Sequence, residues 1–167
     1  ETDVSSLLEQ SYREVNYKDF YRDIFPLGSL EEKGVYEVGK YNAIARSIKV
    51  GDSKTKRYIV TDDLDVLDEL VKCDDFCIIR PISFIGKSAK SSNARFMYAM
   101  AIDLDGVKKK KNFDFLIHQI SNGHNMLSVV WGLPKPTYLV SSGTGIHLYY
   151  VFAVSYTHLT LPTSDLV

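Results

Sequence analysis

The sequence predicts an α+β fold with a mainly antiparallel central sheet and flanking helices. The chain has 167 residues, of which 45% are hydrophobic and 25% charged, enough for one sizeable core. Helical and strand-like segments also mix without the strict alternation that builds a parallel sheet. This composition excludes a disordered, collagen-like or disulfide-framework chain. No apolar run is long enough to cross a bilayer, so we expect no membrane partner.

The first half of the chain predicts two helices and three strands. Apolar residues at helical spacing favour a helix over 7–25, with Asn16 as a point of interruption and Pro26 as its end. An Asp at 62 or 63 is expected to cap a second helix, which runs to about residue 72. Short apolar segments between turn residues predict strands over 43–50, 57–61 and 76–85.

The second half predicts three more strands and one helix. A polar loop over 86–93 leads into 96–104, which has the most buried-looking pattern of all the strands. A helix is expected over 112–120. Two final strands, 137–141 and 146–152, flank a Ser-Gly-Thr-Gly turn.

The charge distribution and the cysteine content indicate what kind of partner the chain binds and in which cellular compartment it occurs. Residues 1–79 hold 11 Lys and Arg against 17 Asp and Glu, whereas residues 80–167 hold 9 against 4. A basic half suits a polyanion such as a nucleotide or nucleic acid, although an acidic surface beside a basic one explains it equally well. Two cysteines, Cys73 and Cys77, are too few for a disulfide scaffold and fit a reducing cytoplasm.

The two ends suggest a truncated protein. The chain begins with Glu1 instead of Met, and residues 155–163 match the translation of a sequencing-library adapter, the transposase end sequence, at every position. We therefore expect residues 1–154 to be the natural part and 155–167 to be derived from the adapter. A genuine Thr-rich terminal strand is the alternative.

Two carboxylates end the apolar strand predicted over 96–104. Residues two apart on a strand point to the same face, so Asp103 and Asp105 project together. Adjacent carboxylates repel each other, and a hard cation such as Mg²⁺ or Mn²⁺ relieves the repulsion. A solvated Asp-x-Asp-Gly turn at the end of a strand is the alternative.

A glycine turn and a histidine follow in the last predicted hairpin. Gly143 and Gly145 let the backbone approach a phosphate closely, the Ser142 hydroxyl and backbone N–H groups are free to bind it, and His147 begins the next strand. The turn lacks the spacing of the known dinucleotide and Walker loops. An ordinary hairpin turn beside a hydrogen-bonded strand histidine is the alternative.

Together these motifs resemble the archaeo-eukaryotic primase superfamily, above all the primase-polymerases of plasmids, phages and conjugative elements. The family has a hydrophobic strand ending in Asp-x-Asp, then a small residue, any residue and His, here Gly145-Ile146-His147. Segments 19–26, 41–45 and 81–87 also look like replication proteins of mobile elements. The family's third acidic motif has no counterpart before residue 154.

The resemblance implies an RRM-like catalytic core, incomplete at its C-terminus, that performs template-directed nucleotidyl transfer. It implies that Asp103 and Asp105 hold Mg²⁺ or Mn²⁺ and that His147 contacts the incoming nucleoside triphosphate. Single-stranded DNA would be the template, a helicase a further partner, and the fragment itself inactive. Lys87, Lys90 and Arg95 are candidates for phosphate contacts, or else belong to a solvated loop. A non-catalytic DNA-binding domain of replication initiation and an Asp-x-Asp sugar-nucleotide transferase are the rival functions.

Overall fold

A computed structural model describes residues 13–49, 51, 54–73, 75–104, 132, 134–141 and 145–157. The chain divides into two compact units, each of which is described by itself. The first unit comprises Glu1–Tyr17 and Ala101–Tyr150, and the second comprises Lys18–Met100 and Val151–Val167. The fold is α+β with antiparallel sheets, as predicted, but the described strands form two sheets instead of one.

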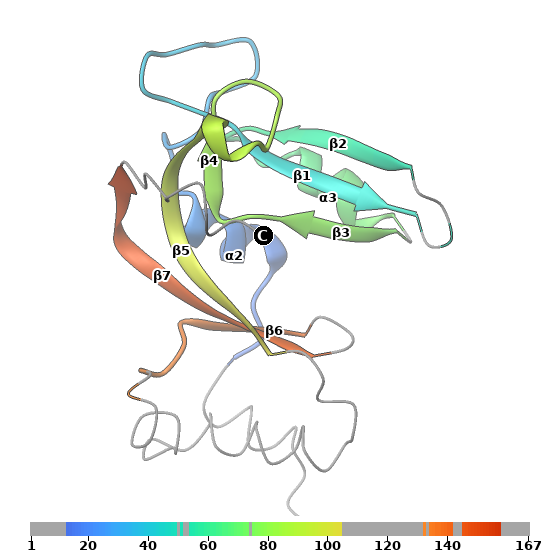
Figure 1. Cartoon of the computed structure of the whole chain (residues 1–167), viewed down its shortest axis with the longest axis vertical. Coiled ribbons are helices and arrows are strands. Elements are labelled where there is room, and N and C mark those ends of the chain that lie inside the picture. The colour runs from blue at the N-terminus through green and yellow to red at the C-terminus, as the bar shows by residue number, and fades with distance from the viewer. Residues whose placement is uncertain are drawn as a thin grey trace, which may run out of the picture. The chain divides into compact units, whose positions relative to one another are not determined.

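The three-stranded sheet has the order β2-β1-β3 and lies in the second unit (Figure 1). Strand β1 (Ala43–Ile48) is central, with β2 (Thr55–Val60) and β3 (Phe76–Ile79) antiparallel on its two sides. Helix α3 (Val66–Val71) connects β2 to β3. Ala43, Ala45 and Ser47 of β1 are almost fully buried, because their small side chains face the side that the helix covers.

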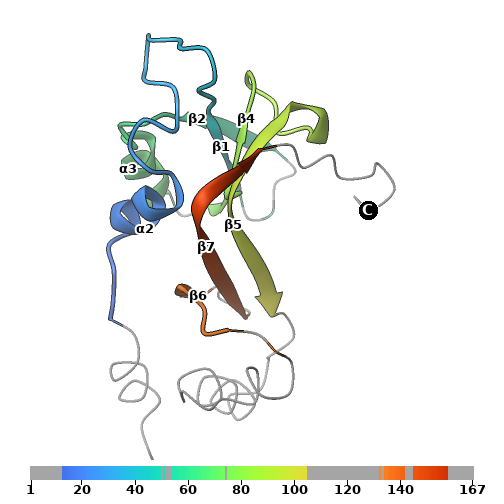
Figure 2. The same cartoon turned by 90° about the vertical axis from the view of Figure 1, so that its left-hand side faces the viewer.

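The four-stranded sheet has the order β4-β5-β7-β6. Its edge strands, β4 (Ile82–Phe84) and β6 (Tyr138–Ser141), pair antiparallel with two long inner strands. These are β5 (Ala94–Leu104) and β7 (Ile146–Thr157), which run side by side in Figure 2. A short 3₁₀ turn, Ser91–Asn93, precedes β5.

Helix α2 (Tyr17–Ile24) anchors the core of the second unit. Its Phe20 and Ile24 are buried, and Phe25, directly after it, is fully buried with its ring 5.1 Å from the ring of Tyr98 on β5. Lys18 on α2 forms a 2.8 Å ion pair with Asp68 on α3. Within the described part of the chain, no helix is long and apolar enough to cross a membrane.

The predicted strand over 76–85 is wrong as a single element. It is two strands, β3 and β4, which pair in different sheets and are separated by Arg80 and Pro81. Proline lacks the N–H that a continuing ladder requires, so the chain leaves one sheet at this point and enters the other.

The first predicted helix and the predicted cap also need correction. Residues 13–16 are not helical, so within the described residues the helix begins only at Tyr17 and ends at Ile24. The N-cap of α3 is Asp65, neither Asp62 nor Asp63. Asp62 instead accepts hydrogen bonds from the Gly28 N–H, and Asp63 accepts one from the Asp65 N–H.

Burial and strand length differ from expectation in the second sheet. Strand β5 is not the most buried strand, because Met100 is 43% exposed, whereas β1 is mostly buried. Strand β7 extends beyond the predicted residue 152 to Thr157, into the segment that resembles an adapter. The helix predicted over 112–120 lies outside the described residues.

Candidate functional site

The two sequence motifs meet in the first unit, on neighbouring strands of the four-stranded sheet. His147 near the start of β7 places its Nε2 atom 3.3 Å from Oδ1 of Asp103, near the end of β5. Asp103 is 56% exposed and His147 is 31% exposed. Ile146 and Leu148, the neighbours of His147, are buried. Strand alternation therefore sends the apolar residues to the core and leaves the imidazole beside the carboxylate.

Tyr149 is a buried residue beside His147. It lies two residues after His147 on β7, with the two rings 6.4 Å apart. Burial raises the pKa of the Tyr149 hydroxyl, and the negative charge of Asp103 raises it further. Sequence reasoning missed this residue, because an aromatic residue within an apolar strand is usually a core residue. Its two-residue spacing from His147 was the available signal.

The strands on either side of the predicted turn pair with each other. Strands β6 and β7 pair antiparallel from Tyr138 opposite Tyr149 to Ser141 opposite Ile146. Gly145 is buried directly before β7. Ser142 and Gly143 lie outside the described residues, as does Asp105 at the end of the acidic motif.

The donors at this site suit a divalent cation. Carboxylate oxygens are the ligands that Mg²⁺ and Mn²⁺ prefer. Within the described residues, the Asp103 carboxylate has one polar contact, to His147, and more than half of its surface is open. No group of three or more His, Cys, Asp or Glu gathers among those residues. Asp103 thus offers a carboxylate donor beside His147, and Asp105 belongs to the same sequence motif as Asp103.

The three basic candidates belong to the second unit. Lys87 and Lys90 are exposed on the loop after β4. Arg95, at the start of β5, donates hydrogen bonds of 2.9 Å to the carbonyl oxygens of Ser92 and Ala94. These contacts hold the guanidinium against the loop and leave its charge without a carboxylate partner among the described residues.

The second unit also contains an open pocket of about 350 Å³, lined mainly by apolar and aromatic side chains. Phe96, Tyr98 and Phe152 contribute its aromatic rings. Burial raises the pKa of the Tyr98 hydroxyl. The Tyr98 hydroxyl lies 3.5 Å from the carbonyl oxygen of Ser29, which also lines the pocket.

No family model, no curated protein and no solved structure matches this chain.

Proposed function

We propose that this chain is part of a metal-dependent nucleotidyl transferase of the primase-polymerase type, with an RRM-like catalytic sheet and a single-stranded DNA template. The approach of His147 to within 3.3 Å of Asp103 carries the proposal. The two residues come from separate motifs, whose order along the chain resembles that of the primase superfamily. Their position on neighbouring strands of an antiparallel sheet supports a common role.

Each residue has a separate task in this proposal. Asp103 and Asp105 would hold Mg²⁺ or Mn²⁺, which would neutralise phosphate charge while a 3′-hydroxyl attacks the α-phosphate and pyrophosphate leaves. His147 donates a hydrogen bond to the triphosphate from the imidazole edge that now faces Asp103. Gly145, with Ser142 and Gly143, allows the backbone to approach the phosphates.

Binding of Mn²⁺ and a nucleoside triphosphate to the 167-residue chain tests the site directly. Electron paramagnetic resonance would measure free Mn²⁺, with and without the triphosphate. We expect Asp103→Asn to weaken Mn²⁺-dependent triphosphate binding about tenfold or more, because a charged oxygen donor is lost. The control is Asp63→Asn, which removes the same charge from an exposed residue of the second unit. Equal losses in both variants would contradict the assignment.

Nucleotide incorporation tests the reaction. A protein that joins residues 1–154 to the third acidic motif implied by the resemblance should add labelled nucleotides to a primer on a single-stranded template, and His147→Ala should raise the KM for nucleotide. Sugar transfer without polymerisation would overturn the proposal. Replication that is unaffected by Asp103→Ala would instead indicate a non-catalytic DNA-binding domain.

A further inference from the structure

One face of the three-stranded sheet is open and carries arginines. Residues directly opposite each other on antiparallel strands share a face. The register places Arg46 opposite both Arg57 and Ile78, and it places Ile48 opposite both Thr55 and Phe76. We call this the open face. Its members are Arg46, Ile48, Thr55, Arg57, Ile59, Phe76 and Ile78, which are exposed or half-buried, whereas Ile44 lies on the same face but is buried. Arg80 lies just after β3, and its guanidinium bonds to the same loop after β4 as that of Arg57.

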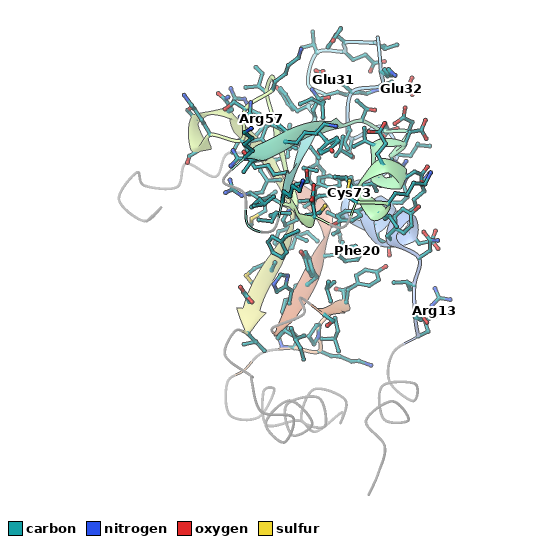
Figure 3. All side chains as sticks on the ribbon, turned by 90° about the vertical axis from the view of Figure 1, so that its right-hand side faces the viewer. Arg13, Phe20, Glu31, Glu32, Arg57 and Cys73 are labelled. Carbon is teal, nitrogen blue, oxygen red and sulfur yellow. The ribbon has the colours of Figure 1, made fainter. Side chains whose placement is uncertain are left out.

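The opposite face of the same sheet is covered by α3. The Cys77 thiol lies 3.9 Å from the carbonyl oxygen of Leu70 on that helix. Figure 1 shows α3 behind the sheet, and Figure 3 shows Cys73, two residues after α3, apart from Arg57. On the open face, by contrast, Phe76 is 52% exposed and Ile78 is 40% exposed. These apolar side chains therefore face solvent between basic neighbours.

Arg46 and Arg57 on the open face and Arg80 after β3 keep their charge. Strands β1, β2 and β3 contain no acidic residue, and no ion pair to Arg46, Arg57 or Arg80 forms within the described part of the chain. Arg57 donates a 2.8 Å hydrogen bond to the carbonyl oxygen of Lys87, and Arg80 donates one of 3.3 Å to that of Ala89. These bonds orient the guanidinium groups without neutralising them.

The same bonds add further positive charge. They bring the loop after β4, which carries Lys87 and Lys90, to one end of the open face. Like charges directly opposite on neighbouring strands destabilise a sheet, so the pairing of Arg46 with Arg57 is unfavourable in the free protein. A bound anion would remove this repulsion.

We propose that the open face binds single-stranded nucleic acid, with its phosphates on Arg46, Arg57 and Arg80 and a base stacked on Phe76. Guanidinium groups match phosphate geometry through paired donors. An exposed ring on a sheet offers a stacking surface to unpaired bases, which a duplex keeps hidden. The inference rests on the proposed function, since it gives the template a binding surface, but binding here needs neither metal nor triphosphate.

Fluorescence anisotropy with a labelled oligothymidylate of about 20 nucleotides tests this surface on the 167-residue chain. Three phosphate contacts predict a slope of about −2 for log affinity against log salt concentration. Replacing all three arginines with glutamine should weaken binding about tenfold or more and flatten that slope. Phe76→Leu should weaken binding and leave the slope unchanged, because it removes a ring and no charge.

The chain offers a matched control on the covered side. Lys56 is the sequence neighbour of Arg57 and pairs with Ser47, so it belongs to the opposite face. A triple variant that changes Lys33, Lys56 and Lys72 to glutamine has the same total charge as the arginine variant. It should bind the oligonucleotide within about twofold of the unchanged chain. Circular dichroism and thermal melting would establish that every variant is folded.

Three results would overturn the inference: equal losses in both triple variants, a preference for duplex over single-stranded DNA, and binding to phosphatidylserine vesicles without binding to the oligonucleotide. The two proposals can also fail separately. Oligonucleotide binding through the open face without metal-dependent triphosphate binding would overturn the proposed function alone. Triphosphate binding at Asp103 without oligonucleotide binding would overturn only this inference.

Discussion

Asp62 is a buried carboxylate that holds together the segment after α2 and the turn before α3. It is 3% exposed and accepts hydrogen bonds of 3.0 and 2.9 Å from the Gly28 N–H. The Arg22 guanidinium donates to both its side chain and its carbonyl oxygen. The sequence predicts a helix cap at Asp62 or Asp63, because Asp is common at the position directly before a helix. A contact to a glycine 34 positions away in the sequence has no local signal.

Asp62→Asn should destabilise the chain by about 2–3 kcal/mol, because Arg22 loses its anionic partner in a mostly buried place. Urea unfolding followed by circular dichroism measures the free energy of unfolding. Asp65→Asn is the matched control: it is exposed, its side chain makes no cap hydrogen bond, and it should cost no more than about 0.5 kcal/mol. Equal costs would contradict the structural role of Asp62.

The pKa of Tyr149 depends on the charge of Asp103. Because that charge contributes to the raised pKa, Asp103→Asn should lower the pKa of Tyr149. The value should stay above the ordinary one of about 10, since burial is the larger cause. Nuclear magnetic resonance titration of tyrosine labelled with ¹³C at Cζ would follow this single ring. No change in its pKa would mean that Asp103 and Tyr149 do not share a face in solution.

At the scale of elements, the hydrophobic pattern predicted where strands form better than it predicted which strands pair with each other. The strands near 43–50, 57–61, 137–141 and 146–152 all exist, because each is a short apolar segment between turn residues. The division of 76–85 was missed, although Pro81 marked the place where the ladder breaks. Which sheet each half joins depends on residues far away in the sequence, which no local pattern records.

Substitution of a small residue of β1 tests how tightly the covered face of the sheet is packed. Ala45 is fully buried, opposite Tyr58 on β2 and Ile79 on β3. Ala45→Leu should destabilise the chain by about 1–3 kcal/mol, because a tightly packed core does not accept the added carbons without strain. Ile78→Val, on the open face, should cost about 0.5 kcal/mol or less. Urea unfolding of both variants compares the two faces, and equal costs would contradict their assignment.

At the scale of the molecule, three tyrosines make stability depend on alkaline pH. Burial raises the pKa of Tyr98, Tyr149 and Tyr150. The unfolded chain therefore releases these protons at lower pH than the folded chain. We expect full stability below about pH 10 and a loss as the pH rises through the folded pKa values. The Tyr98→Phe, Tyr149→Phe double variant should lose less stability over the same pH range. Urea unfolding at a series of pH values measures this, and a free energy of unfolding that does not change with pH in the unchanged chain would contradict the prediction.

The candidate site was predictable from the sequence only in part. Asp103 and His147 were named because motifs with chemical meaning lie in the chain itself, and the sheet brings them within 3.3 Å. Their roles remain predictions. The open face was not predicted, because Arg46 and Arg57 look like ordinary surface residues until the register pairs them. Cross-strand neighbours follow from pairing, and pairing is a property of the whole fold.

The open face also determines how the chain should behave during purification. The whole chain has a net charge of −1 and an isoelectric point near 6.5. These two values suggest weak retention on a cation-exchange or heparin column at neutral pH. Local charge, however, governs adsorption to a charged matrix. Arg46 and Arg57 lie opposite each other on one face of the sheet, Arg80 follows β3, and the three strands contain no acidic residue. The chain should thus be retained on heparin through one side, with the molecule oriented on the resin.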